Sequence, residues 1–172
     1  MKTISFTLDK ASIDKAIREI RQYADEVKQG TELLRQKVAE RVGWSAAHGF
    51  STALVGDVVR GAPQANDVHV TVEHGDSVSV VFAEGDQAVF IEYGAGVYNN
   101  GAAGSSPHPW GAQFGYYIGG YGQGKGKRQT WGYYDESGKL VLTHGTPAAM
   151  PMYNGLEDAK RVIEDLAREV FG

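Results

Sequence analysis

The stretch from Val68 to Phe82, VHVTVEHGDSVSVVF, decides the fold class of this 172-residue chain. Valines alternate with polar residues as far as Val72, a polar segment follows at His74–Ser77, and the alternation resumes at Val78. Two alternating runs around a short polar segment predict a β-hairpin with one buried face. The chain should therefore contain antiparallel sheet.

Toward the C-terminus the sequence predicts more sheet. The apolar run Ala88–Tyr93 is interpreted as a third strand that ends at Gly94. A second hairpin is expected from the run Thr130–Tyr134, the polar turn Asp135–Gly138 and the run Lys139–Thr143. The two hairpins could share one antiparallel sheet.

Before the first hairpin, the sequence predicts a short strand and two helices in series. The alternation of Ile4, Phe6 and Leu8 has the period of a strand. Ser12 suits the N-cap of a helix that ends near Gly30, and Thr31 can cap a second helix. Each helix carries an apolar stripe at 3.6-residue spacing, formed by Ile13, Ala16, Ile17, Ile20, Ala24 and Val27 in the first and by Leu34, Val38 and Val42 in the second.

A third helix is expected at the C-terminal end of the sequence. Pro151 suits its first turn, and the apolar stripe consists of Leu156, Ala159, Ile163, Leu166 and Val170. The prediction is an α+β fold in which a small antiparallel or mixed sheet of about four to five strands packs against N-terminal helices and a C-terminal helix. Residues 1–172 should form a single domain, because this length suits one core.

A glycine-rich and aromatic loop at about residues 94–129 interrupts this domain. Eleven of the 23 glycines lie between Gly94 and Gly126. Glycine raises the entropic cost of ordering a loop, whereas large aromatic side chains are effective contact groups. We expect the loop to pack on something outside its own domain, such as another copy of the chain, through Trp110, Phe114, Tyr116, Tyr117, Tyr121, Lys125, Lys127 and Arg128.

Charge and composition exclude several classes of protein. The net charge is -4, and no Lys or Arg occurs between Gly61 and Gly124, so this segment should not read nucleic acid. The absence of cysteine excludes thiol catalysis and disulfides. The sequence contains no apolar run of about 18 residues, so it predicts no membrane span. The first residues lack the apolar run of a signal peptide. We expect a soluble protein.

Motifs for small-molecule chemistry are weak. Residues Gly119–Lys125 match G-x-x-x-x-G-K, but Gly126 stands where a phosphate-binding loop needs Ser or Thr. The histidines lack metal-ligand spacing, so we expect no metal and no cofactor. A hydrolase with two carboxylates, drawn from Glu73, Glu84 and Glu92, remains an alternative that only the distance between the carboxyl groups can test.

Two islands of sequence carry a resemblance to a known family. The first is VFIEYGAG at 89–96, and the second runs from WGYY at 131–134 to THGTPAAMPMY at 143–153, with His108–Pro109 between them. Their order resembles the tail-component family of lambdoid phages, also called neck, tail-completion or head-tail joining proteins. The chain departs from the family pattern at Ala95, where Thr is usual, and at Met152, where Phe is usual.

The resemblance implies structural roles for the matched residues, which are Glu92, Tyr93, Gly94, Gly96, His108, Pro109, Trp131, Tyr133, Thr143, Gly145, Pro147 and Pro151. Gly94, Gly96 and Gly145 would provide positive φ. Glu92, at the end of the expected strand, would accept hydrogen bonds from turn amides or pair with a neighbouring subunit. The first of these roles is favoured.

The function implied by the resemblance is that of a non-enzymatic virion protein of a tailed bacteriophage or prophage. It would act at the neck or upper tail, after assembly in the host cytoplasm, as a ring of copies in contact with other neck, connector or tail proteins. DNA would pass through the ring without sequence-specific binding. A carbohydrate-binding or host-recognition module that uses Trp110, Tyr116, Tyr117 and Tyr121 as stacking platforms is the main alternative.

Overall fold

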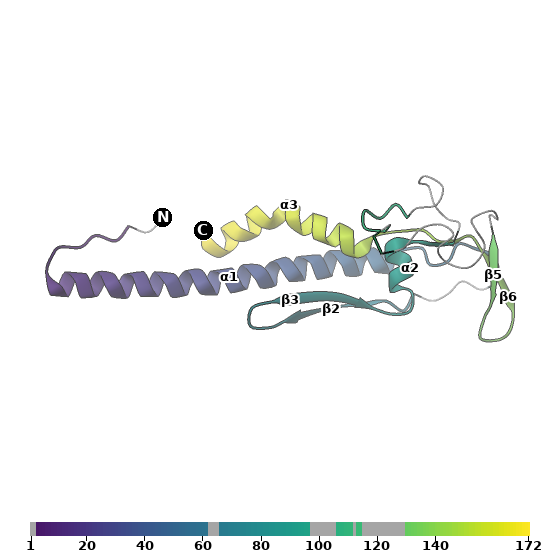
Figure 1. The fold of residues 1–172 in the computed structure, drawn as a ribbon, viewed down its shortest axis with the longest axis horizontal. Coiled ribbons are helices and arrows are strands. Elements are labelled where there is room, and N and C mark those ends of the chain that lie inside the picture. The colour runs from purple at the N-terminus through teal and green to yellow at the C-terminus, as the bar shows by residue number, and fades with distance from the viewer. Residues whose placement is uncertain (1–2, 62–65, 97–105, 112, 115–129) are drawn as a thin grey trace.

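The computed structural model describes residues 3–61, 66–96, 106–111, 113–114 and 130–172. Its longest element is the N-terminal helix α1 (Lys10–Thr52), and the C-terminal helix α3 (Pro151–Phe171) packs along the second half of α1 (Figure 1). Small antiparallel sheets complete the described part of the molecule. The expected α+β class is confirmed.

The prediction of two N-terminal helices is wrong, because α1 continues through Gly30 without a break. A glycine inside a helix costs about 1 kcal/mol relative to alanine, which weakens a helix but does not end it. The Thr31 hydroxyl donates to the carbonyl of Val27 at 2.8 Å instead of capping a new helix. Packing compensates for the glycine, since the ring of Phe171 in α3 lies over Gly30.

The start of α1 also differs from the prediction. Its N-cap is Asp9, whose carboxylate accepts the Ser12 N–H at 2.9 Å, so Ser12 is the capped residue. The strand expected at Ile4–Leu8 is not formed: the segment has no pairing partner in the described part of the chain and folds back beside α1 (Figure 1). The Thr7 N–H donates to the Ser12 hydroxyl at 2.9 Å.

Helix α3 begins at Pro151, as expected, and runs antiparallel to α1. Close packing occurs at Gly155, where an added Cβ would lie 2.8 Å from the carbonyl oxygen of Val42. Ion pairs join the edges of the two helices at Arg41–Asp158 (2.6 Å) and Lys37–Glu169 (3.0 Å). The helix pair is therefore held by close backbone approach as well as by apolar contact.

The first predicted hairpin is confirmed. Strands β2 (His69–His74) and β3 (Ser79–Glu84) pair antiparallel, with Val72 opposite Val81, and pack against α1. Gly43 of α1 makes room for the side chain of Val72.

The second predicted hairpin is also confirmed, but it lies in a different sheet. Strands β5 (Trp131–Tyr134) and β6 (Leu140–Thr143) pair antiparallel, and β1 (Val58–Arg60) occupies the other edge of β6. Strands β4 (Ala95–Gly96) and β7 (Gly145–Thr146) form a separate two-residue ladder. The single sheet of four to five strands is thus replaced by three small sheets in the described residues.

The run interpreted as a third strand is the short helix α2 (Ala88–Tyr93). Its residues Ala88 and Ile91 are three positions apart, so a helix places both on one face, and both are buried against Phe50 and Val55. The Asp67 carboxylate accepts the N–H groups of Asp86 and Gln87 just before this helix. A short apolar run does not by itself distinguish strand from helix.

None of the helices in the described ranges combines the length and apolarity needed to cross a bilayer.

Candidate functional site

The two islands of the family-like pattern meet in space, at the point where α3 begins. Ala95 and Gly96 in β4 pair with Thr146 and Gly145 in β7. The Ala149 N–H donates to the Ile91 carbonyl at 2.8 Å. We call the contact among α2, residues 106–111 and the start of α3 the junction.

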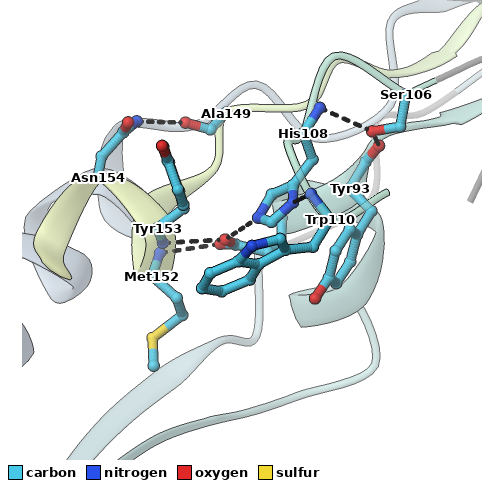
Figure 2. Close-up of polar contacts among 9 residues, drawn as sticks. Tyr93, Ser106, His108, Trp110, Ala149, Met152, Tyr153 and Asn154 are labelled. Carbon is cyan, nitrogen blue, oxygen red and sulfur yellow. Dashed lines mark hydrogen bonds and ion pairs between the residues drawn. The ribbon is translucent and has the colours of Figure 1, made fainter. Parts of the chain in front are cut away.

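Glu92 is the central residue of the junction and is only 7% exposed. Its Oε2 accepts the Met152 N–H at 2.8 Å, and its Oε1 accepts the Tyr153 N–H at 3.0 Å (Figure 2). These are the second and third residues of α3, whose own N-cap residue, Met150, provides no capping side chain. Glu92 therefore does from a distance what an N-cap side chain does locally, and its charge is favourable at a helix N-terminus.

His108 forms the third hydrogen bond to this carboxylate and is 3% exposed. Its Nε2 lies 3.0 Å from Oε1 of Glu92, and its Nδ1 lies 3.0 Å from the backbone nitrogen of Trp110 (Figure 2). A backbone N–H can only donate, so Nδ1 is the acceptor and Nε2 carries the proton. The imidazole is thus neutral and donates to Glu92.

Further polar contacts hold His108 in this position. The His108 N–H donates to the hydroxyl of Ser106 at 3.2 Å, and that hydroxyl donates to the carbonyl of Tyr93. These two hydrogen bonds link residues 106–110 to α2. Glu92 thereby receives three donors, which is the condition for holding a carboxylate away from water.

Aromatic rings surround the Glu92–His108 pair. The Tyr93 ring lies 4.4 Å from the imidazole between centroids, and Trp110 and Tyr153 meet edge to face at 5.7 Å. Phe114 contacts Tyr93 with centroids 6.0 Å apart. Trp110 is 44% exposed and Phe114 56% exposed, so the outer part of this aromatic cluster faces solvent.

The remaining matched residues have structural positions. Gly94 and Gly145 have φ values of 81° and 107°, which confirms the expected positive φ at these two. Gly96 lies instead in the β4 ladder opposite Gly145. Thr143 is buried, and its hydroxyl donates to the Asp57 carbonyl at 2.9 Å and accepts the Gly145 N–H at 2.9 Å.

Other matched residues lie around the junction or in the neighbouring sheet. Trp131 and Tyr133 are in β5, opposite Thr143 and Val141. Partial burial raises the pKa of the Tyr133 phenol, and the Asp135 carboxylate adds to this shift. Pro147 follows β7, Pro151 is buried at the first turn of α3, and Pro109 is exposed beside the buried His108.

Six of the proposed assembly-loop residues lie outside the described residues: Tyr116, Tyr117, Tyr121, Lys125, Lys127 and Arg128. Trp110 and Phe114 are described and lie at the junction. Of the residues proposed for the assembly loop, the structure therefore places Trp110 and Phe114.

The chemical capacity of the junction follows from these contacts. Both oxygens of Glu92 already accept hydrogen bonds, and the strand-end position expected for Glu92 is corrected to a helix. In the ranges that the structure describes, no group of three or more His, Asp or Glu side chains is placed to hold a metal ion. The hydrogen bonds of Glu92, His108 and Ser106 join α2, residues 106–110 and the start of α3.

Sequence reasoning did not identify the residues that Glu92 binds. The available signal was Met150–Pro151, because a helix that begins after Met lacks the Ser, Thr, Asp or Asn expected at an N-cap. Such a helix needs an acceptor from elsewhere. Ser106, which bridges Tyr93 and His108, had no sequence signal beyond its place in the loop.

Comparisons with protein-family models, with curated proteins and with solved structures found no match to this chain.

Proposed function

We propose that this chain is a non-enzymatic structural component of a tailed bacteriophage or prophage that acts in head-tail joining or tail completion. The observation that carries the proposal is the junction. The residues that resemble the tail-component family come from three separate segments, and those at its centre hold one another in place.

The use of Glu92 and His108 favours a structural role. They are the carboxylate and the imidazole of the matched set, and in the described structure they bind each other and the start of α3. A catalytic pair needs a position from which it can reach a substrate. Here the pair is buried under Tyr93, Trp110 and Tyr153.

The proposed partners are other copies of the chain and adjoining neck, connector or tail proteins. Trp110 and Phe114 present partly exposed rings at the junction, and large aromatic groups are common anchors in protein interfaces. The copies would form a ring around the DNA path in the virion. The stretch without Lys or Arg from Gly61 to Gly124 would let DNA pass without strong binding.

The test is complementation of a phage or prophage in which this gene has been deleted. We expect the deletion to leave DNA-filled heads and separate tails, and the intact gene to restore infectious particles. The double substitution Trp110→Ala and Phe114→Ala should reduce particle joining without unfolding the protein. Tyr134→Ala is the matched control, because it removes an exposed ring that lies in β5. Normal infectious particles from the deletion strain would refute the proposal.

A carbohydrate-binding module is the second candidate, and the exposed rings of Trp110 and Phe114 favour it. Sugar rings stack on exposed aromatic faces, and the junction would hold Trp110 rigidly against Tyr153. A glycan array tests this function directly. We expect binding that Trp110→Ala removes if this candidate is correct, and no binding if the structural role is the complete function.

A further inference from the structure

The N-terminal segment, residues 3–8, has the pattern of a strand but no strand to pair with in the described part of the chain. Its apolar residues Ile4, Phe6 and Leu8 alternate with residues that carry hydroxyl groups. Phe6 is 60% exposed and Leu8 94% exposed, so the apolar side of the segment faces solvent. A segment of this kind is completed by pairing with the edge of a sheet.

The β2–β3 hairpin offers such an edge at β2. The two strands form a two-stranded sheet in the described residues, so β2 has a strand on one side only. The Gly75 N–H donates to the Val78 carbonyl at 2.8 Å, and every second pair from there is hydrogen-bonded within the hairpin. The backbone groups of the intervening residues Val70, Val72 and His74 therefore point outward. An open edge of this kind is a template for another strand.

The N-terminal segment cannot reach this edge in its own chain. It folds back beside the start of α1, whereas the end of β2 lies further along, where His74 Nε2 is 3.7 Å from Oε1 of Glu40 (Figure 1). Glu40 is thirty residues after Lys10, or ~45 Å along α1. Ile4 is six residues before Lys10 and extends at most ~20 Å from the helix start. The edge that the segment can reach is that of another copy.

We propose that the N-terminal segment of one copy pairs antiparallel with the β2 edge of a second copy and becomes the third strand of that sheet. The pairing sets Ile4, Phe6 and Leu8 opposite His74, Val72 and Val70 of the second copy. Val70 and Val72 are half-buried on the face that packs against α1. The apolar side of the segment therefore extends the apolar face of the hairpin.

The outer face matches in the same register. Ser5 comes opposite Glu73 of the second copy, and Thr7 comes opposite Thr71. Both residues of β2 are exposed. Pairs of threonine hydroxyls are favourable across strands, and the serine hydroxyl can donate to the carboxylate. Apolar residues thus meet apolar residues on one face, and polar residues meet polar residues on the other.

The other edge of the hairpin, at β3, does not provide this match. Side chains of a strand alternate between its faces, so Val81 and Ala83 lie on one face of β3 and Val80 and Phe82 on the other. Both faces are apolar. The hydroxyl groups of the N-terminal segment would lie beside apolar side chains in either orientation. The β2 edge is therefore the site of pairing.

The start of α1 already presents the correct side of the segment. Successive N–H groups of a strand point to opposite sides, so those of Phe6 and Leu8 face one way and that of Thr7 faces the other. The Thr7 N–H donates to the Ser12 hydroxyl at 2.9 Å. The N–H groups of Phe6 and Leu8 have no acceptor in the described structure. Pairing uses these free groups and leaves the Thr7–Ser12 hydrogen bond in place.

This contact goes beyond the proposed function, which names other copies as partners but not the segments that join them. A segment that binds a different surface of the next copy makes a heterologous contact, and such contacts build rings when they close. The pairing is argued from the geometry of the chain alone. Its failure would leave the complementation test of head-tail joining unaffected, and a deletion strain with normal particles would leave the pairing intact.

The first experiment uses the absence of cysteine in the natural chain. Chains with Ser5→Cys and chains with Glu73→Cys, carrying C-terminal tags of different size, are mixed and oxidised. The proposed register makes these two positions a non-hydrogen-bonded pair with Cα atoms ~4.5 Å apart, so we expect a mixed disulfide.

Glu136→Cys replaces Glu73→Cys in the control mixture, because Glu136 is equally exposed but lies in the turn of the second hairpin. This mixture should give at least about tenfold less mixed disulfide. Equal yields of mixed disulfide from the two mixtures would refute the pairing.

The second experiment measures the mass of the purified protein by sedimentation equilibrium from micromolar to millimolar concentration. We expect an average mass above that of the monomer, increasing with concentration. Phe6→Asp should weaken this association at least about tenfold, because it places a carboxylate against Val72 of the second copy.

Leu54→Asp is the matched control, since Leu54 is 55% exposed and lies just after α1, away from the segment and the β2 edge. It should leave the association unchanged, and circular dichroism should show equal helix content in both variants. A protein that is monomeric at every concentration would refute the proposal, as would an association that Phe6→Asp leaves unchanged.

Discussion

Glu92 illustrates how one buried carboxylate joins three segments of a chain. Its three donors come from two amides at the start of α3 and from His108. Each segment alone leaves a polar group unsatisfied: α3 has free N–H groups, residues 106–110 have a buried imidazole, and α2 has a buried charge. Their combination satisfies all of them, so the junction should form or fail as a unit.

Substitution of Glu92 by Gln should therefore destabilise the protein. Gln keeps the shape of the side chain, but it removes the charge and places an NH₂ group against an N–H donor. We expect a loss of about 2 kcal/mol in the free energy of unfolding. Urea denaturation measures this loss. Glu157→Gln is the control, because it alters a solvent-exposed ion pair with Lys160 within α3. It should change the free energy of unfolding by less than about 0.5 kcal/mol. Equal effects of the two substitutions would contradict the capping role.

Asp67 makes a related contact at the start of α2, and it predicts an effect of pH. The N–H of Asp86, followed by that of Gln87, holds the pKa of Asp67 below its ordinary value. A lowered pKa in the folded state means that the stabilisation is present above the unfolded value of about 3.9 and is lost as pH falls through the folded value. The natural protein should thus lose its stability advantage over Asp67→Asn on acidification.

The measurement is the free energy of unfolding of both proteins between neutral pH and about pH 3. Asp76→Asn, in the exposed turn of the first hairpin, is the control and should follow the natural protein. A constant difference between the natural protein and Asp67→Asn across this range would show that the lowered pKa of Asp67 does not contribute to folding.

At the scale of elements, α1 and α3 each contain a glycine at an interior helix position, and the surroundings of the two glycines differ. Gly30 is an interior helix residue covered by the ring of Phe171, the last residue of α3, which is 50% exposed. Gly155 faces the backbone of α1 at Val42 and Ala46. A ring at a helix end can move, whereas the backbone of a packed helix cannot.

The same substitution should accordingly have opposite effects at the two positions. Gly30→Ala should raise stability by about 0.5–1 kcal/mol, because alanine favours the helix and the Phe171 ring can turn aside. Gly155→Ala should lower stability by about 1–3 kcal/mol, since its Cβ would lie 2.8 Å from the Val42 carbonyl oxygen. Thermal unfolding of the two variants measures both effects. A stabilised Gly155→Ala variant would show that the helices are not so closely packed.

At the scale of the whole molecule, the structure covers the two halves of α1 unequally. The second half packs against α3 on one side and against the β2–β3 hairpin on another (Figure 1). The first half is contacted by the N-terminal segment at Ser12 and by the end of α3 at Gly30, and its residues Ile13, Ile17 and Ile20 are exposed. Most helical stability in proteins comes from packing, so the first half should open more easily.

Amide hydrogen exchange should show this difference directly. In dilute protein, we expect residues 13–27 to exchange at least about tenfold faster than residues 38–50. Equal and slow exchange in both halves at low concentration would contradict the inference that the first half of α1 lacks support.

The sequence was sufficient for the elements that have a long or regular pattern. The alternation at Val68–Phe82 and the stripe after Pro151 identified both a hairpin and α3. The second hairpin followed from its turn residues. Short patterns are insufficient: the apolar run Ala88–Tyr93 suits a strand as well as the helix that it forms, and Gly30 has the look of a helix end although α1 continues through it.

The sequence by itself determined the α+β class, both hairpins and the helical stripes, because these depend on periodicity and on local turn and capping preferences. Only the tertiary structure decided that α1 is continuous, that the hairpins lie in separate sheets, and that Glu92 caps α3 with His108. The reason is distance along the chain: Glu92 and Met152 are sixty residues apart. No local pattern encodes which buried carboxylate will meet which helix end; packing of the core residues around Phe50 and Ile91 brings them together.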